Sequence, residues 1–435
     1  MVARIKKVTV AIPTWGGLAH LRHCLPALAG QRAGRLERET LVFDNSADPR
    51  LATWLGREHP RVRLLSSRRN IGFAAACNRL AEAASGDAVA FLNDDTRPCD
   101  LWLAALTEAY AAAPEDVAAV SGLLLDWTGD RLDFGEGIVT FDGHALQRGH
   151  RTAICTAPVP HAGAELPFAC GGNMLVHRDR FLDSGGFDET FFAYFEDVDL
   201  GWRLWQEGFR VIAAPEARAC HRMAGSSDRL GIYERGYLFE ANAYRVAYKN
   251  YEDGLWETVA PLVLLVLISR STHALQASRP GGGQLRARPL ERHQDGASQG
   301  TASCPVAEPE PRWQRRSTAA TLMRAAQRVG ATISSKVAGL YPWPALWVTD
   351  ERAIGQLRLL DLVVSGDDLL RRSRRRVQAR RKRPDSEIFA RFPRYVVPTY
   401  PGDQVVLSAE NVARWLPENF PVRHATLAEL RNGVT

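Results

Sequence analysis

The chain has 435 residues, of which 46% are hydrophobic and 24% are charged, as in an ordinary globular protein. This length allows two domains, or one large domain with an appendage. The seven cysteines are an odd number and include no Cys-x-x-Cys pair, which argues against a disulfide framework and a structural zinc site.

The formal net charge of +6 comes from one segment of the chain. Nine Arg or Lys residues and no acid lie between Arg371 and Arg383, so the rest of the chain is slightly acidic. The first residues, Met1 to Lys7, lead directly into a strand-like segment and lack the apolar core of a signal peptide. The longest apolar stretch, Pro261 to Ile268, is far shorter than the roughly 20 residues that span a membrane. We therefore expect a cytoplasmic protein.

Strand and helix patterns alternate over the first 125 or so residues. The expected strands are Val8–Ile12, Thr40–Phe43, Val62–Leu65 and Ala88–Leu92, and the expected helices are Leu18–Ala29, Phe73–Ala84 and Leu101–Ala113. This alternation implies a parallel, doubly wound sheet. Ligands bind at the carboxyl ends of the strands in such sheets. We therefore expect Asp44, Asp94 and Asp95, which follow two of these strands, to share one crevice.

The pattern changes after residue 125. Short strands are expected over Leu132–Val139, Phe141–Leu146, Phe209–Ala213 and Ala217–Cys220, with a helix over Phe195–Glu207 and helical structure from Glu240 to Gln276. Residues Ser278–Pro311 have the composition of a disordered linker, and helical patterns follow over Thr318–Gly339 and Glu351–Val364. The expected divisions are a catalytic domain (1–250), a helical segment suited to a membrane interface (251–277), a linker (278–315) and a helical, basic C-terminal region (316–435).

Two acidic motifs carry the expected chemistry. Asn93-Asp94-Asp95-Thr96 lies at a strand end, and adjacent carboxylates suit Mg²⁺ or Mn²⁺, which take hard oxygen ligands. An Asp-Asp turn is also a common loop or helix cap. The second motif, Glu196-Asp197-Val198-Asp199, opens a helix directly after the aromatic segment 191–195. Acids in a first helical turn often stabilise the helix dipole, but a carboxylate beside an aromatic pocket could also take a proton from an attacking hydroxyl.

His221 follows an expected strand and precedes a short flexible stretch. A neutral imidazole can complete a divalent metal site, although a single histidine is more often structural.

In their order along the chain, these elements resemble family 2 glycosyltransferases from about Val8 to Tyr251. The resemblance is closest to the rhamnosyltransferase-like branch. The matching segments are Val10–Thr14, Phe43–Ser46, Asn70–Phe73 with Asn78, Phe91–Thr96, Gly185–Glu189, Phe195–Leu200 and His221. The resemblance implies the GT-A fold, a Rossmann-like doubly wound mixed sheet flanked by helices, here with a mostly helical C-terminal extension.

The resemblance also implies roles for individual residues. Asp95 and His221 would bind Mg²⁺ or Mn²⁺, and Asp197 would be the catalytic base. Asn93 replaces the first acid of a strict Asp-x-Asp, which leaves the role of Asp94 open between the ribose and the metal. The nucleotide would be bound by Pro13, Thr14, Trp15, Asp44, Asn70, Gly72 and Asp94. The donor-sugar and acceptor pocket would be formed by Gly171, Gly172, Asn173, Asp188, Glu196 and Trp202.

The resemblance therefore implies an inverting, metal-dependent transferase. The donor would be dTDP-rhamnose or a UDP-sugar, and the acceptor a glycan or lipid-linked glycan in bacterial cell-surface polysaccharide synthesis. With one carboxylate as base and the leaving group held opposite, a single displacement inverts the anomeric centre.

Two other classes of function stay open. A nucleotidyltransferase would make the sugar nucleotide, but it normally has a Gly-rich, Arg-containing loop where this chain has Pro13–Gly17. A non-catalytic protein could bind nucleic acid or anionic lipid through Arg371–Arg383, whereas such a run is as often a solvated helix face. We expect no nucleic-acid partner, and we expect the basic run to provide peripheral contact with the inner face of the cytoplasmic membrane.

Overall fold

The computed structural model describes residues 5–31, 36–222, 227–277, 358–359, 362–363, 368–400 and 403–433. The chain divides into two compact units, one formed by residues 1–269 with 366–435 and the other by residues 270–365. The expected linker 278–315 and the expected helix 318–339 lie outside the described residues. The C-terminal residues from 366 onward thus belong to the same unit as the expected catalytic domain.

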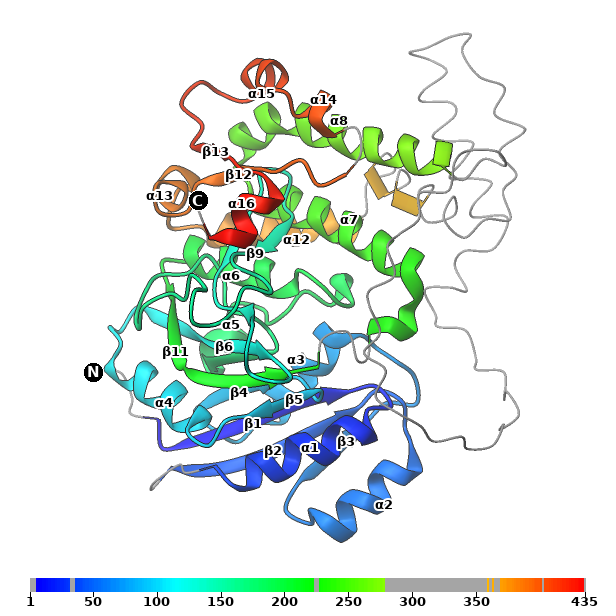
Figure 1. The fold of residues 1–435 in the computed structure, drawn as a ribbon, viewed down its shortest axis with the longest axis vertical. Helices are drawn as coiled ribbons and strands as arrows, with labels where there is room; N and C mark the ends of the chain where they lie inside the picture. Colours follow the sequence, from blue (N-terminus) through cyan, green and yellow to red (C-terminus); the bar gives the residue numbers. More distant parts are fainter. Residues whose placement is uncertain are drawn as a thin grey trace. The chain divides into compact units, whose positions relative to one another are not determined.

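A mixed sheet forms the core of the first unit (Figure 1). Its strands are in the order β3-β2-β1-β4-β10-β6-β11-β5, and β7 pairs with β6 beside this path. The first four strands along the chain are β1 (Lys7–Thr14), β2 (Glu37–Asp44), β3 (Arg63–Ser66) and β4 (Ala88–Leu92), and they run parallel. Every residue of β4 is buried, as expected of a central strand covered on both faces.

The sheet changes direction at β10 (Asn173–His177). This strand lies antiparallel between β4 and β6 (Val117–Asp126), while β11 (Arg210–His221) runs parallel to β6. The short strands β5 (Thr96–Pro98) and β7 (Leu132–Phe134) are antiparallel to β11 and β6. The mixed sheet that the family resemblance implied is therefore confirmed, although the two strands expected over 209–220 are one strand with an irregular register between Ala214 and Arg218.

The helices near the sheet have the expected positions. The helix α1 (Leu18–Ala29) has the predicted bounds, α3 (Phe73–Ala83) packs on β1 and β2, and α4 (Trp102–Ala112) packs on β6 and β11. The helices α2 (Pro49–Glu58) and α5 (Arg178–Asp183) and the strands β6 and β10 were not predicted. The start of α2 has two features common to helix N-termini: Asp48 caps the helix, and proline occupies its first turn.

The remaining elements lie outside this mixed sheet. They are β8 (Gly137–Val139), β9 (Ala145–Gln147), η1 (Glu189–Phe191), α6 (Glu196–Gln206), η2 (Ser227–Leu230), α7 (Gly231–Asn250), α8 (Asp253–Ala277), α12 (Asp368–Arg380), α13 (Asp385–Arg391), β12 (Arg394–Val396), α14 (Asp403–Val406), α15 (Ala409–Trp415), β13 (Val422–His424) and α16 (Leu427–Asn432). None of the described helices combines the length and apolarity needed to cross a membrane.

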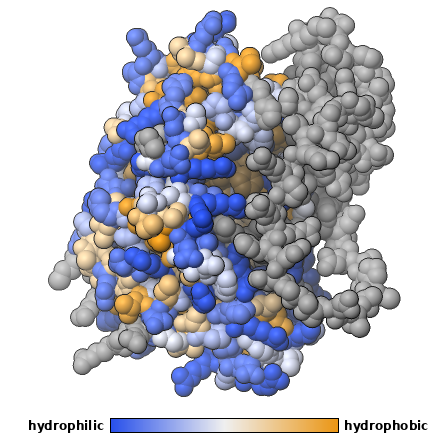
Figure 2. Space-filling model, viewed as in Figure 1, coloured by the Kyte–Doolittle hydropathy of each residue, from blue (hydrophilic) through white to orange (hydrophobic). Residues whose placement is uncertain are grey.

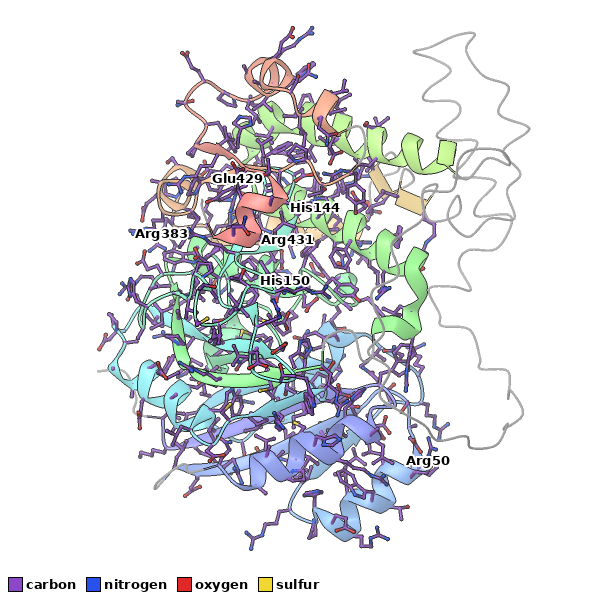
Figure 3. All side chains as sticks on the ribbon, in the orientation of Figure 1. Arg50, His144, His150, Arg383, Glu429 and Arg431 are labelled. Atoms are coloured by element: carbon purple, nitrogen blue, oxygen red, sulfur yellow. The ribbon has the colours of Figure 1, made fainter. Side chains whose placement is uncertain are left out.

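The C-terminal region packs on the catalytic domain within the first unit. The helix α12 packs against α7, α13 packs against α6, and β12 lies beside the β8–β9 hairpin. Arg383, Glu429 and Arg431 of this region are labelled in Figure 3. On the face shown in Figure 2, hydrophilic and apolar residues of the described part are interspersed.

The basic run forms most of α12 and the turn after it, and several of its charges are paired within the protein. Arg374 pairs with Asp253, Arg380 forms two bonds of 2.8 Å with Glu207, and Arg381 pairs with Asp385. The run is thus largely a packing surface, and its exposed basic residues include Arg372, Arg375 and Arg376.

Candidate active site

The topology brings several strand ends to one edge of the sheet. The strands β1, β4 and β11 run in the same direction, so Thr14, Asp94 with Asp95, and His221 lie at neighbouring strand ends. Gly171 and Gly172 precede the antiparallel β10 and reach the same edge. A cavity of about 560 Å³ opens there, which is within the usual size range of ligand pockets.

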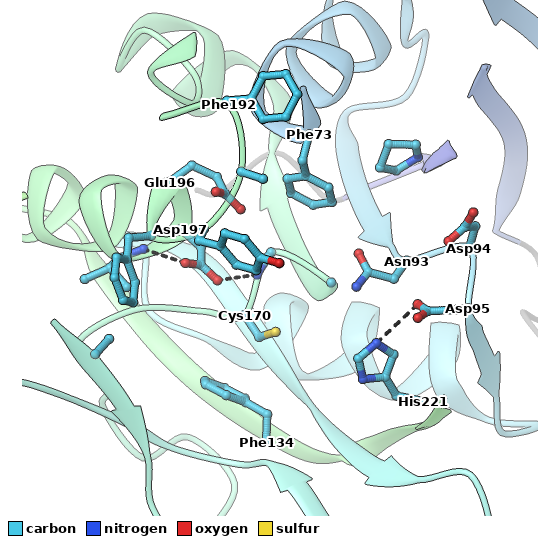
Figure 4. Close-up of a pocket in the computed structure, with 18 of the residues that line it drawn as sticks. Phe73, Asn93, Asp94, Asp95, Phe134, Cys170, Phe192, Glu196, Asp197 and His221 are labelled. Atoms are coloured by element: carbon cyan, nitrogen blue, oxygen red, sulfur yellow. Dashed lines mark hydrogen bonds and ion pairs between the residues drawn. The ribbon is translucent and has the colours of Figure 1, made fainter. Parts of the chain in front are cut away.

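Asp95, His221 and Asp133 form a chain of polar contacts at one end of the cavity. The Nε2 atom of His221 lies 3.2 Å from Oδ1 of Asp95, and its Nδ1 atom lies 2.7 Å from Oδ2 of Asp133 (Figure 4 shows Asp95 and His221). Burial alone would lower the pKa of His221, but its bonds to Asp133 and Asp95 raise that pKa to about 10. The ring is therefore held in a fixed orientation between two carboxylates.

The adjacent carboxylates of Asp94 and Asp95 are in different electrostatic environments. Burial, followed by the charge of Asp95, raises the pKa of Asp94 to about 7. Burial acts in the same direction on Asp95, but His221 outweighs it and lowers the pKa of Asp95. The hydroxyl of Thr14 donates to Oδ2 of Asp94 at 2.5 Å, which ties the end of β1 to this pair.

The donor set at this end of the cavity fits a hard divalent cation. Asp95 offers a carboxylate, and His221 would offer an imidazole nitrogen once a metal ion displaces its proton, while Asp133 holds the other nitrogen, which is the usual arrangement of a ligating histidine. The described residues contain no group of three or more His, Cys, Asp or Glu side chains arranged around a metal position. Two protein ligands nevertheless suffice for Mg²⁺ or Mn²⁺, which complete their coordination with phosphate oxygens and water.

Asp197 lies across the cavity from this pair, at the first turn of α6 (Figure 4). Its Oδ2 accepts a hydrogen bond from the backbone N–H of Gly171 at 2.9 Å, and its Oδ1 accepts one from Val198 at 2.8 Å. Burial raises its pKa, and these backbone donors oppose the shift. The carboxylate is thus oriented by the backbone and has lone pairs left for a ligand.

The neighbouring acids of the same motif have other environments. Asp199 is fully buried and binds Arg203 at 2.8 Å and Lys249 at 2.9 Å, so it is a structural residue. Glu196 lines the cavity with an exposed fraction of 5%.

An aromatic segment with strained backbone forms another wall of the cavity. Phe192, Tyr194 and Phe195 have positive φ angles of 62°, 71° and 66°, which L-residues other than glycine, asparagine and aspartate seldom adopt. All three line the cavity, and Phe239 of α7 packs against Tyr194 with ring centroids 4.6 Å apart. Backbone strain of this kind is typical of functional sites.

The side chain of Asn242 holds this aromatic segment in place. It is fully buried on α7, and its Nδ2 atom lies 2.8–2.9 Å from the carbonyl oxygens of Phe191, Ala193 and Tyr194. Arg245 donates to its Oδ1 at 2.7 Å. The helix α7 therefore fixes the aromatic wall through one amide.

Most of the site residues expected from the sequence line this cavity. They are Pro13, Thr14, Trp15, Asn70, Asp94, Asp95, Gly171, Gly172, Glu196, Asp197 and His221. Five others do not line it: Asp44, Gly72, Asn173, Asp188 and Trp202.

Two of these five belong to the expected nucleotide site. Asp44 is 1% exposed, and its carboxylate accepts bonds from Ser46 and Asp48 in the turn after β2. Its neighbour Asn45 lines the cavity instead. Gly72 has φ 91°, and a side chain there would collide with the backbone of Phe192, so this glycine permits close packing of the aromatic segment.

The other three were expected in the sugar pocket and are structural. Asn173 is fully buried and accepts a bond of 2.7 Å from the indole of Trp102. Asp188 binds Lys249 at 2.7 Å, and Trp202 packs beneath the guanidinium of Arg394, 3.8 Å from its ring centroid. These three side chains therefore make packing contacts and do not line the cavity.

Some residues at the site were not predicted from the sequence. Asp133 lies in a short strand that looked purely structural, and Phe134, Phe168 and Cys170 reach the cavity only because the sheet brings them there. Asp142, His144 and Glu240 form a buried cluster behind Phe195. These residues lie up to 98 positions apart in the sequence, so their spacing could not reveal the cluster.

Comparison with known proteins agrees with this geometry. Residues 9–181 match the family model described as glycosyl transferase family 2. The O-antigen biosynthesis protein RfbC of Myxococcus xanthus is 31% identical over 55% of this chain, and the match spans 19% of that protein's length. The N-acetylglucosaminyl-diphospho-decaprenol L-rhamnosyltransferase of Mycobacterium tuberculosis is 29% identical over 51% of this chain and 77% of its own.

Among solved structures, GalNAc-T7 with UDP, GalNAc and Mn²⁺ is 15% identical and has a TM-score of 0.46, with 65% of this chain and 53% of that chain covered. The fold assignment itself rests on the observed strand order. Residues 9–181 therefore form a domain of the glycosyl transferase family 2 type, and the relatives of the chain include an L-rhamnosyltransferase.

Proposed function

We propose that this chain is an inverting glycosyltransferase that transfers a sugar from a nucleotide diphosphate to a hydroxyl of a growing glycan. The observation that supports this most is the position of Asp197 across one cavity from Asp95 and His221. A base on one side and a site for the leaving diphosphate on the other are what a single in-line displacement requires.

The residues of the cavity suggest how the reaction proceeds. Pro13, Trp15 and Asn70 would contact the nucleotide at the ends of the first strands. Asp95 and His221 would hold Mg²⁺ or Mn²⁺, which when bound neutralises the charge of the leaving diphosphate. Asp197 would accept the proton of the acceptor hydroxyl. At the same time the hydroxyl oxygen would bond to the anomeric carbon, and the bond between that carbon and the diphosphate oxygen would break. Attack from the face opposite the leaving group inverts the configuration.

The donor we propose is dTDP-rhamnose or a UDP-sugar, and the acceptor a glycan or lipid-linked glycan of a bacterial cell-surface polysaccharide. The names of the two relatives support this choice, since one is an L-rhamnosyltransferase and the other an O-antigen biosynthesis protein. We further propose a cytoplasmic protein that contacts the inner face of the membrane through the exposed arginines of α12.

A screen of the purified protein against a panel of nucleotide sugars tests the proposal. We expect slow hydrolysis of one donor in the presence of Mg²⁺ or Mn²⁺. Excess chelator, or the substitution Asp95→Ala, should abolish that turnover. If the protein neither binds nor hydrolyses any nucleotide sugar, the proposal fails. Full turnover in excess chelator would refute only the metal assignment.

A further inference from the structure

Glu196 is a buried acid beside the cavity with one oxygen that has no hydrogen-bond partner. The residue is 5% exposed and lines the cavity at the first turn of α6. Among the described residues, no group lies within hydrogen-bond distance of its Oε2 atom. Buried polar atoms are nearly always satisfied, so an unsatisfied one at a ligand cavity indicates where a ligand atom binds.

The surroundings of Glu196 favour its neutral form. It lines the same cavity as the rings of Phe73 and Phe192 (Figure 4), and no cation pairs with it among the described residues. Burial, followed by the charge of Asp197, raises the pKa of Glu196 well above its usual value. A buried, unpaired carboxylate avoids a large desolvation penalty by keeping its proton. A protonated carboxyl group has an O–H to donate.

The three acids of this motif therefore occupy different chemical environments. Asp199 is neutralised by Arg203 and Lys249, and Asp197 is bound by two backbone N–H groups. Of these three side chains, only that of Glu196 has an oxygen without a protein partner that would stabilise a negative charge. Neighbouring carboxyl groups in such different surroundings have different protonation states, and they therefore have different roles.

We propose that Glu196 acts as a neutral carboxylic acid that donates a hydrogen bond to a sugar hydroxyl in the cavity, and so determines which sugar is accepted. This inference rests on the proposed glycosyltransferase function and adds a role that differs from that of the base. Its position beside Asp197 places it at the reacting end of the cavity. The hydroxyl belongs either to the donor sugar or to the acceptor, and the two cases give different binding results.

The substitutions Glu196→Ala and Glu196→Gln distinguish a neutral acid from a charged one. Gln keeps a neutral donor in nearly the same shape, whereas Ala removes the hydrogen bond. Glu207→Gln is a matched control, because Glu207 is also a buried acid next to α6 but binds Arg380 outside the cavity. The control should keep wild-type affinity for every ligand.

The experiment titrates each variant with the preferred nucleotide sugar and with the corresponding nucleoside diphosphate. If the partner is a donor hydroxyl, Glu196→Ala should weaken nucleotide-sugar binding about tenfold, roughly the effect of one hydrogen bond, and leave diphosphate binding unchanged. If it is an acceptor hydroxyl, donor binding should be unchanged and the acceptor KM should rise by a similar factor. In both cases Glu196→Gln should recover most of the loss.

Infrared spectroscopy gives a readout that does not depend on turnover. The difference spectrum between the wild type and Glu196→Gln at neutral pH should contain the C=O stretch of a protonated carboxyl group. The inference is overturned if only a carboxylate band is lost, if Gln is as damaging as Ala, or if Ala behaves as wild type. A wild-type protein that binds no nucleotide sugar at all would instead refute the proposed function.

Discussion

The Nδ1 atom of His221 lies 2.7 Å from Oδ2 of Asp133, so the histidine at the end of β11 is oriented by an aspartate from the short strand β7. The other ring nitrogen is thereby directed towards Asp95. A buried carboxylate behind a histidine fixes both its tautomer and its angle, which is the role of such partners around metal ions.

We expect Asp133→Asn to weaken divalent-metal binding by about 10- to 100-fold, because the amide cannot hold the imidazole as the carboxylate does. Titration with Mn²⁺ in the presence of a nucleoside diphosphate would measure this. Asp130→Asn is the control, since Asp130 is exposed in the turn that precedes β7. Unchanged Mn²⁺ affinity in Asp133→Asn would mean that His221 is not a ligand.

The amide of Asn242 should matter for both stability and activity. Asn242→Ala leaves buried carbonyl groups of the aromatic segment and the guanidinium of Arg245 without their partner, so we expect a loss of about 2–4 kcal/mol in the free energy of unfolding. The strained segment should then relax, which lowers turnover even in the folded protein. Denaturant unfolding and turnover at saturating donor would measure the two effects. Wild-type values for both would contradict the role of this amide.

His144 should make stability depend on pH in the alkaline range. Burial alone would lower the pKa of His144, but Asp142 of the β8–β9 turn and Glu240 of α7 raise it to about 9. The folded state therefore binds the proton more tightly than the unfolded state does. This contribution is complete below the unfolded pKa of about 6.5 and is lost as pH rises through about 9.

The expected size of this contribution is about 3 kcal/mol, from a pKa raised by between two and three units. Melting temperatures of the wild type and of His144→Gln, measured between pH 6 and pH 10, test it. The difference between the two proteins should be largest near pH 6 and should shrink towards pH 10. A difference that does not change with pH would show that His144 is neutral in the folded protein.

Exposed and ion-paired arginines of the basic run should respond differently to substitution. Arg372, Arg375 and Arg376 lie on one face of α12, and replacing all three with Gln should weaken binding to anionic vesicles by up to about 3 kcal/mol at low salt. Arg383→Gln is the comparison, because Arg383 binds the carbonyl oxygens of Trp205 and Phe209, and its loss should lower stability instead. If the triple variant binds vesicles as the wild type does, the exposed face is only solvated.

Sequence patterns predicted the elements in which apolar residues recur at a regular helical or strand spacing. The helix α1 has its expected bounds, and Asp94 and Asp95 lie at the cavity as expected of residues at a strand end, whereas Asp44, expected in the same crevice, does not line it. The fully buried β6 was missed, since a continuous apolar run does not alternate as a half-exposed strand does.

What could not be predicted depends on contacts between distant segments. Trp202 looked like a pocket residue after an acidic motif, yet its indole donates to Asp385, which is 183 positions away. Arg374 and Arg380 looked like part of a free cationic stretch, although their partners Asp253 and Glu207 lie on other elements. Side-chain direction at such positions is decided by packing, which a single sequence does not contain.

The central claim is that Asp197 is the catalytic base opposite a diphosphate site. We expect Asp197→Asn to bind the nucleotide sugar with near wild-type affinity, because Asn is nearly isosteric and its amide oxygen can still accept one of the two backbone N–H groups, that of Gly171 or that of Val198. It cannot take the acceptor's proton, so transfer should fall by at least about a hundredfold. Asp199→Asn should instead lower stability, because Asp199 binds Arg203 and Lys249 in the core.

The most direct measurement compares the rate of sugar transfer and the donor affinity of the wild type, Asp197→Asn and Glu196→Gln. Transfer lost only in Asp197→Asn, with donor affinity unchanged, is the predicted result. Near wild-type transfer by Asp197→Asn together with its loss in Glu196→Gln would contradict the account, because the proton would then go to the other carboxyl group.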